Sequence, residues 1–278
     1  GMNLAVVGDN RPRLYWAMTA AQALGGIPVP LYQDAIANEM IYVLDDAEIE
    51  FAIVEDQEQV DKLLEVESQL AARGRAVRHL IYEDPRGLRD YDHPSLLSYE
   101  RVQEIGREFD RANPGFFDAA VQAGAPEDTA IILYTSGTTG KPKGVCHSHA
   151  GLIGSARNGC QFDGLGADDD VLSYLPMAWV GDNLFSYAQA LVAGFTVNCP
   201  ESRETVMTDL REIGPTYYFA PPRIYEGLLT QVMIRMEDAG WIKRRLFQWA
   251  MNVARRCGAD ILDKRPVATL DRLRYALG

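Results

Sequence analysis

Apolar residues in the first part of the chain form short runs that are separated by longer amphipathic segments. The runs predict four strands, at residues 4–7, 27–31, 51–54 and 79–82. The segments between them have apolar residues at helical spacing and predict helices over 16–24, 36–47 and 57–72. Strands that alternate with helices are typical of a mostly parallel sheet covered on both faces, so we expect an α/β fold.

A second alternating pattern follows a less regular connection over residues 83–128. A further strand is expected at 129–133, and Ser148 is a suitable cap for a helix that reaches about residue 160. Beyond it, strands are predicted at 171–176, 195–198 and 217–220, with helices at 184–193 and 206–213. We therefore expect two α/β subdomains, residues 1–165 and 166–278, and the second is predicted to end in a helical tail that begins near residue 223.

The tail contains an apolar stripe with basic residues around it. The stripe consists of Ile242, Leu246, Trp249, Val253 and Cys257, and the basic residues are Lys243, Arg244, Arg245, Arg255 and Arg256. A basic amphipathic helix of this kind can lie on an anionic membrane surface. Such a stripe more often packs on the protein's own core while its charges remain solvated, and we favour this second interpretation.

Composition and charge limit the function classes. The chain has 278 residues, of which 47% are hydrophobic and 24% charged, as expected for a soluble globular protein. A net charge of −12 argues against general nucleic-acid binding. The four cysteines have neither zinc-site spacing nor the density of a disulfide framework. Together with the lack of a visible signal peptide, these features predict a cytoplasmic protein, with a peripheral position on the inner face of the membrane as the variant that the basic tail allows.

The residues with the clearest chemistry follow the strand expected at 129–133. They read Tyr134-Thr-Ser-Gly-Thr-Thr-Gly-Lys-Pro-Lys-Gly-Val145. The glycines let the backbone turn and point N–H groups inward, the hydroxyls can donate hydrogen bonds or face a metal ion, and the lysines add positive charge. Such a loop suits a polyphosphate. It is not a Walker A loop, because Pro142 stands where that pattern requires a glycine. An exposed turn between two strands is the alternative interpretation on composition alone.

The order of these residues resembles the phosphate-loop signature of the acyl-adenylate-forming (AMP-binding) enzymes, which include acyl-CoA synthetases, adenylation domains and luciferase. Residues 20–31 also resemble a segment of this superfamily, and the stretches at 219–226, 243–250 and 273–276 are similar to long-chain fatty-acyl-CoA synthetases in particular. The resemblance implies the N-terminal domain of this fold, with two mostly parallel sheets flanked by helices, in a truncated form.

The resemblance also implies a reaction and its reactants. A fatty acid would be activated by ATP with Mg²⁺ to an acyl-adenylate, and coenzyme A would then accept the acyl group. The partners implied are a fatty acid, ATP and coenzyme A, and the activity is that of an AMP-forming long-chain-fatty-acid–CoA ligase. Acyl length and oligomeric state are left open by the sequence.

The family's functional residues can be carried over to matching positions of this chain. The nucleotide-binding residues implied are Thr135, Ser136, Gly137, Thr138, Thr139, Gly140, Lys143 and Gly144. Among them Lys143 and Thr139 would act in catalysis, and Thr135 is the expected contact for Mg²⁺. The acyl channel would involve Trp179, Asn183, Phe219 and Pro221. Trp179 departs from the family pattern, which commonly has histidine there, and a role in the core is an equally good interpretation.

Several parts of the family pattern have no match in this chain. These are the downstream Tyr-Gly-x-Thr-Glu segment, the aspartate that binds ribose and the small C-terminal domain with its catalytic lysine. We therefore expect these 278 residues alone to be inactive. Two other functions stay open: an adenylating enzyme for a different carboxylic acid, and a nucleotide-binding module without turnover.

Overall fold

A computed structural model of the protein describes residues 2–135 and 140–277. The chain divides into two compact units, Gly1–Tyr218 and Phe219–Gly278, which are described separately. The boundary expected between residues 165 and 166 lies inside the first unit, in the connection between helix α7 (His149–Asp163) and strand β8 (Asp170–Leu172). A division into subdomains at that connection stays a prediction.

The first unit is built around a five-stranded parallel sheet in the order β2-β1-β3-β4-β5. The strands are β1 (Asn3–Val7), β2 (Ile27–Leu31), β3 (Phe51–Val54), β4 (His79–Tyr82) and β5 (Leu96–Ser98). The four strands expected from the apolar runs are confirmed. Strand β2 lies at the edge of the sheet, where Pro28 and Pro30 are tolerated because an edge strand leaves some N–H positions unpaired.

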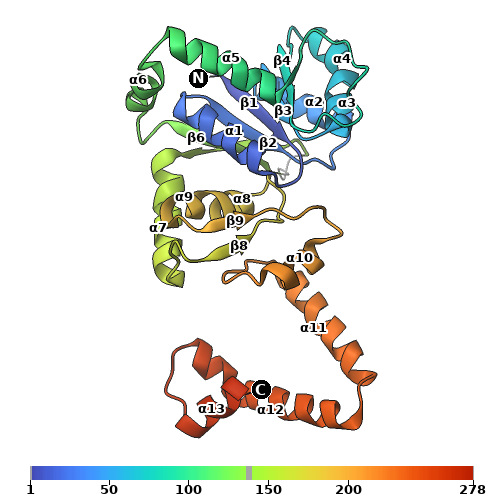
Figure 1. The fold of residues 1–278 in the computed structure, drawn as a ribbon, viewed down its shortest axis with the longest axis vertical. Coiled ribbons are helices and arrows are strands. Elements are labelled where there is room, and N and C mark those ends of the chain that lie inside the picture. Colours follow the sequence, from blue (N-terminus) through green and yellow to red (C-terminus); the bar gives the residue numbers. More distant parts are fainter. Residues whose placement is uncertain (1, 136–139, 278) are drawn as a thin grey trace. The chain divides into compact units, whose positions relative to one another are not determined.

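Helices cover both faces of this sheet, which confirms the α/β class (Figure 1). Because side chains alternate along a strand, Ala5 and Val7 pack on one face and Val6 on the other. The first face is covered by α2 (Ala37–Asp46), α3 (Gln57–Glu65) and α4 (Glu67–Ala71). Helices α3 and α4 replace the single helix expected over 57–72, which is interrupted at Val66. The other face is covered by α1 (Pro12–Ala23). Helices α5 (Tyr99–Ala112) and α6 (Phe116–Ala123) follow the last strand of the sheet.

An antiparallel hairpin follows, and it carries the predicted phosphate loop. It consists of β6 (Thr129–Thr135) and β7 (Lys143–Ser148). Ala130, Ile131 and Leu133 of β6 are buried in the same core cluster as α1. Helix α7 begins directly after β7, where the Ser148 hydroxyl accepts the Gly151 N–H at 3.1 Å, so the predicted cap is confirmed.

The last part of the first unit contains two short parallel strands, β8 and β9 (Thr196–Asn198). Between them runs a continuous helical segment composed of α8 (Val180–Asp182), the π-helix η1 (Asn183–Ala188) and α9 (Gln189–Ala193), and α10 (Val206–Ile213) comes after β9. The strand expected at 217–220 is wrong, because only Tyr217 pairs there, through an isolated bridge to Val171. Prolines at 215 and 221 bracket that segment and cannot donate to a ladder.

The second unit is helical, as predicted for the tail. Its helices are α11 (Pro222–Glu237), α12 (Trp241–Leu262) and α13 (Thr269–Leu277). Val253 and Cys257 of the predicted stripe are buried, whereas Ile242 and Leu246 are 65% and 60% exposed. The core-packing interpretation therefore holds for the second half of α12 only. Across the described residues, every helix is too short or too polar to cross a membrane.

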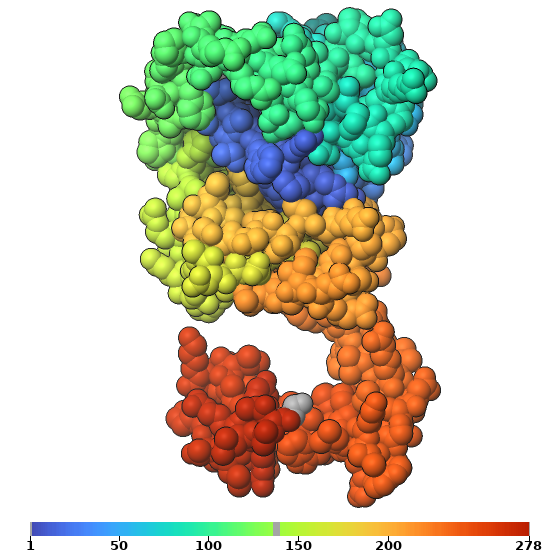
Figure 2. All heavy atoms as spheres, in the orientation of Figure 1, coloured from blue at the N-terminus to red at the C-terminus, as the bar shows by residue number. Residues whose placement is uncertain are grey.

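A buried polar network connects the first sheet to β8 and α8. The Asn10 amide donates to the Ser173 hydroxyl at 2.9 Å and to the Asp182 carboxylate at 3.0 Å, and the Tyr15 hydroxyl donates to Asp182 at 2.7 Å. In Figure 2, blue atoms from the start of the chain lie between the green atoms of α5 and α6 and the gold atoms around β9. Burial penalises the charged carboxylate and raises the pKa of Asp182 to about 6.

The raised pKa predicts how stability depends on pH. Between the ordinary pKa of 3.8 and about 6, folded Asp182 holds a proton that the unfolded chain has released. The Asp182 contribution to the free energy of unfolding therefore falls as pH rises through this window, by roughly 2–3 kcal/mol. We expect Asp182→Asn to remove this contribution, as measured by urea unfolding of both proteins from pH 4 to pH 7.

Exposed Asp118 provides the control, since Asp118→Asn should leave the pH dependence of the wild type unchanged. Parallel stability curves for the wild type and Asp182→Asn over this range would contradict the assignment.

Candidate active site

The register of the hairpin places two of the predicted site residues side by side. Thr135 is paired with Lys143, and Tyr134 with Gly144. Residues directly opposite each other in an antiparallel pair share a face, and neighbours along a strand point to opposite faces. Thr135 and Lys143 therefore project from the same face, and both are exposed. A hydroxyl and an ammonium group are thus adjacent where the predicted loop leaves and re-enters the hairpin.

The predicted loop is described only at its ends. Ser136, Gly137, Thr138 and Thr139 lie outside the described residues, and their contacts with phosphate stay predictions. Gly140 has φ +89°, and no atom lies within 4 Å of the position that a Cβ would take. The left-handed backbone, and not crowding, therefore favours glycine at this position.

Gly144 has a different structural role from the turn expected for it. It lies within β7, where an added Cβ would come 2.9 Å from Ile132 Cγ2 and 3.2 Å from Tyr134 Cζ. The absence of a side chain leaves room for the Tyr134 ring to lie across the hairpin. The nucleotide contact carried over to Gly144 stays a prediction.

A cavity of about 560 Å³ lies beside the described ends of the loop. Its lining combines Thr135, Gly140 and Lys141 with residues of β2 and α2, and it also includes Ala178. Ala178 immediately precedes Trp179, so one cavity contains loop residues and the neighbour of a predicted acyl-channel residue. This juxtaposition of a polar loop and a largely apolar wall defines the candidate site.

The predicted acyl-channel residues are distributed over both units. Trp179 is partly buried, and Gly181 leaves space for its ring, since an added Cβ would lie 2.7 Å from a ring carbon. Asn183 is 1% exposed, and its amide donates to Met177 O at 2.7 Å and to Trp179 O at 2.9 Å. Asn183 therefore shapes the turn that carries Trp179.

Phe219 and Pro221 belong to the second unit, where Pro221 immediately precedes α11. Contact of any of the four residues with an acyl chain stays a prediction.

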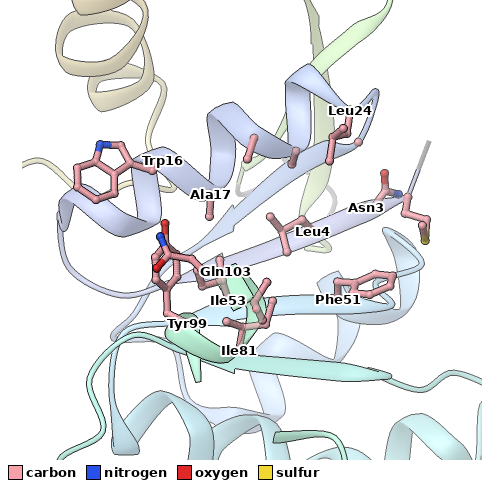
Figure 3. Close-up of a pocket in the computed structure, with 15 residues that line it drawn as sticks. Asn3, Leu4, Trp16, Ala17, Leu24, Phe51, Ile53, Ile81, Tyr99 and Gln103 are labelled. Atoms are coloured by element: carbon pink, nitrogen blue, oxygen red, sulfur yellow. The ribbon is translucent and has the colours of Figure 1, made fainter. Parts of the chain in front are cut away.

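A second cavity, of about 410 Å³, lies between α1 and α5 (Figure 3). Leu4, Ile53 and Ile81 form part of its floor, and none of the described residues that line it is charged. Asn3 and Phe51, at the starts of β1 and β3, also line it. Ligands of open parallel sheets bind beyond the carboxyl ends of the strands. This groove therefore suits neither a phosphate nor a carboxylate group.

The sequence analysis missed the contribution of α2 to the site. Asp46 accepts a hydrogen bond from the Tyr134 hydroxyl at 2.6 Å, and Lys141 Nζ lies 5.6 Å from the centroid of the Tyr42 ring. The i, i+4 spacing of Tyr42 and Asp46 is a signal that both face the same way on a helix. It does not indicate which part of the chain they face.

The residues around the loop suit Mg²⁺ that accompanies ATP. Among the described residues, no group of three or more His, Cys, Asp or Glu could hold a metal ion. Mg²⁺ is often held by one or two protein groups together with substrate phosphates and water. The exposed Thr135 hydroxyl at the cavity fits such a limited donor set, and it is the described residue that would contact the ion.

Comparison with known proteins identifies the family of this chain. The family model described as AMP-binding enzyme matches residues 1–273. The chain belongs to the AMP-binding enzyme family. This confirms the resemblance found in the loop sequence.

Individual relatives in the AMP-binding family are distant. The long-chain-fatty-acid–CoA ligase ACSBG1 of Rattus norvegicus is 26% identical over 259 residues, which cover 90% of this chain and 34% of the relative. The chain thus spans about a third of the length of this curated relative.

Solved structures share the fold. The N-terminal domain of FACL13 from Mycobacterium tuberculosis has a TM-score of 0.55 at 19% identity, covering 81% of this chain and 50% of its own. ATP-bound MatB from Rhodopseudomonas palustris has a TM-score of 0.52 at 21% identity, and the match covers 76% of this chain and 37% of the MatB chain. At these identities the comparison establishes the fold alone, that of the N-terminal part of AMP-binding enzymes.

The Asn183 contacts give a stability prediction. Asn183→Ala should lower the free energy of unfolding by about 1–3 kcal/mol, because the buried Met177 O loses the amide donor and Trp179 O keeps only the Asn183 backbone N–H. Urea unfolding would show a lower midpoint with an unchanged slope. Exposed Asn38 is the matched control, and Asn38→Ala should stay within about 0.5 kcal/mol of the wild type. An equal effect of the two substitutions would contradict the role assigned to the Asn183 amide.

Proposed function

We propose that the protein acts in the ATP-dependent activation of a long-chain fatty acid, first to acyl-AMP and then to acyl-CoA. Membership of the AMP-binding family supports the adenylation step, and the name of the rat relative supports the fatty acid as substrate. The observation that carries the proposal is the adjacency of Thr135 and Lys143, because Thr135 also lines a cavity that extends to Ala178.

The chemistry explains why ATP would be needed. A free carboxylate is a poor acylating agent, because its leaving group would be oxide. In the first step a carboxylate oxygen attacks the α-phosphorus of ATP, and pyrophosphate leaves with the electron pair of the broken P–O bond. In the second step the coenzyme A thiolate attacks the acyl carbonyl, and AMP leaves. Protein groups contribute mainly by placing the reactants and by stabilising negative charge.

We assign the first step to residues within the loop and at its described ends. Lys143 would offset the negative charge that grows on the leaving pyrophosphate, and Thr139 would donate to the same group from within the loop. Ser136, Gly137, Thr138 and Gly140 would complete the phosphate cradle. Thr135 would contact Mg²⁺, which reduces the charge repulsion between the phosphates.

The cavity suits an acyl substrate better than a charged side chain. Apolar residues such as Pro30, Leu31 and Met40 form much of its wall, and polar residues line it both at the loop and on α2. An amino acid would require a charged partner in the pocket, since a buried unpaired charge is costly. Within the part of the chain that is described, Glu39 and Lys141 are the charged residues that line this cavity, and both are exposed.

Lys143 provides the test of the proposed function. In the full-length gene product, Lys143→Ala should slow acyl-adenylate formation by about 10²–10³, because it removes a charge that stabilises the transition state. ATP–pyrophosphate exchange with palmitate measures this step. Transfer of the acyl group from supplied acyl-adenylate to coenzyme A should change much less, since pyrophosphate has already left.

The exposed Arg107 on α5 provides a matched control, and Arg107→Ala should leave both half-reactions unchanged. The melting temperature should be nearly the same in all three proteins, because exposed charges contribute little to folding. Normal adenylation by Lys143→Ala, or equal slowing of both steps, would overturn the assignment of the loop.

The exposed first half of α12 supports peripheral membrane contact as part of the same proposal. Trp241 is 69% exposed, like the neighbouring Ile242 and Leu246, and Lys243, Arg244 and Arg245 lie among these apolar residues. Apolar side chains enter the acyl boundary of a bilayer while basic ones meet anionic headgroups. A cytoplasmic enzyme could in this way approach a membrane-dissolved fatty acid.

Vesicle co-sedimentation tests this contact. Changing Lys243, Arg244 and Arg245 together to Gln should weaken binding to phosphatidylserine-containing vesicles by roughly 100-fold, at about 1 kcal/mol per basic residue. Binding of the wild type should fall as salt rises, because surface charges are screened. The same triple change at Arg101, Arg107 and Arg111 of α5 is the control. Equal wild-type binding to neutral and anionic vesicles would count against membrane contact through this helix.

A further inference from the structure

The last turn of α2 contacts the β6 end of the predicted phosphate loop. The Asp46 carboxylate accepts two hydrogen bonds, from the Tyr134 hydroxyl at 2.6 Å and from the Tyr42 hydroxyl at 3.4 Å. Tyr134 is the penultimate residue of β6, directly before Thr135. Burial and the neighbouring Asp46 carboxylate raise the pKa of Tyr134, so its hydroxyl keeps the proton that it donates.

The same turn of α2 also contacts the other end of the loop. The Lys141 ammonium lies over the Tyr42 ring, 5.6 Å from its centroid, which is within the range of a cation–π interaction. Lys141 follows Gly140 and stands two residues before Lys143, where β7 begins. Tyr42 and Asp46 therefore contact Tyr134 and Lys141 on the two sides of the loop, although residues 135–140 separate these two along the chain.

Helix α2 is a firm support for these contacts. Met40, Ile41, Val43 and Leu44 are buried in the core that covers one face of the five-stranded sheet. The hairpin sequence also suits these contacts, because Gly144 has no side chain and leaves room for the Tyr134 ring. Ile132 and Tyr134 pack against the same core cluster as α2.

We propose that Tyr42 and Asp46 are positioning residues that hold Tyr134 and Lys141, and with them both ends of the phosphate loop, at the separation that nucleotide binding requires. This inference rests on the proposed function. It assigns Lys141 a role that a search for phosphate ligands overlooks, since its charge faces an aromatic ring on α2. Binding residues that are already held in place lose less conformational freedom when a polyphosphate binds. Loss of these contacts should therefore weaken ATP binding, and it should have a smaller effect on the later transfer of the acyl group to coenzyme A.

The test compares two tyrosine–aspartate hydrogen bonds of equal length. Tyr134→Phe removes only the hydroxyl that Asp46 accepts, and Asp46→Asn removes the charge of the acceptor. The matched control is Tyr91→Phe, because the Tyr91 hydroxyl also donates to a carboxylate at 2.6 Å, that of Asp61, but is not part of the hairpin. In the full-length gene product, ATP–pyrophosphate exchange gives KM for ATP and for palmitate separately.

We expect Tyr134→Phe and Asp46→Asn to raise KM for ATP by about tenfold. KM for palmitate, and the rate of acyl transfer from supplied acyl-adenylate to coenzyme A, should remain within about twofold of the wild type. Neither quantity depends on how the ends of the phosphate loop are held. Tyr91→Phe should change none of these values. An unchanged KM for ATP in Tyr134→Phe, or the same increase in Tyr91→Phe, would overturn the inference.

Hydrogen exchange of the 278-residue chain without nucleotide separates this inference from the proposed function. Amides in peptides covering residues 140–145 should exchange several-fold faster in Tyr134→Phe than in the wild type or Tyr91→Phe, because local opening becomes less costly. If the wild type shows no ATP–pyrophosphate exchange while this difference is present, the proposed function fails and the positioning contacts stand. If the exchange rates are equal, the positioning contacts fail whatever the activity.

Discussion

The pairing register of β6 with β7 is the constraint on which the candidate site depends. It turns Thr135 and Lys143 to one face of the hairpin and Tyr134 and Gly144 to the other. A slip of one residue would exchange these faces, directing the hydroxyl and the ammonium toward α2 and the tyrosine ring away from it. Buried Leu133, which belongs to the core under α1, opposes such a slip because it would have to leave that core. The polar chemistry of the hairpin is therefore fixed by an apolar contact.

Two further sets of contacts position the elements that surround the hairpin. Helix α2 is held by its buried apolar residues and presents Asp46 to Tyr134. The network around Asp182 fixes the segment that carries Ala178 and Trp179, because each of its buried polar groups requires its partners. The cavity beside the loop thus depends on one apolar core and one polar network.

The sequence allowed the β/α order to be predicted, because it is local. The loop chemistry is local too, and its contacts with phosphate stay predictions. Buried parallel strands appear as short apolar runs, and glycine, hydroxyl and lysine residues cluster where phosphate is expected. The contact of Tyr134 with Asp46 could not be predicted, since it joins residues 88 positions apart. Periodicity shows which side of a helix is apolar and does not show what that side meets. The strand expected at 217–220 failed for a related reason: apolar residues alone do not ensure that a neighbouring strand is available to pair with them.

The position of the candidate site follows from the contacts made at the carboxyl ends of the strands in the first sheet. In open parallel sheets the crevice beyond the carboxyl ends, at the strand where the order reverses, is the usual place for a ligand. Here Arg11, just after β1, pairs with Glu55 and also donates to Pro200 O and Glu201 O, while Arg203 pairs with Asp9. These contacts dock the segment after β9 onto the carboxyl ends of β1 and β3. With that crevice engaged in joining the two sheets, the proposed nucleotide site falls on the hairpin instead, where Thr135 and Lys143 are exposed among the described residues.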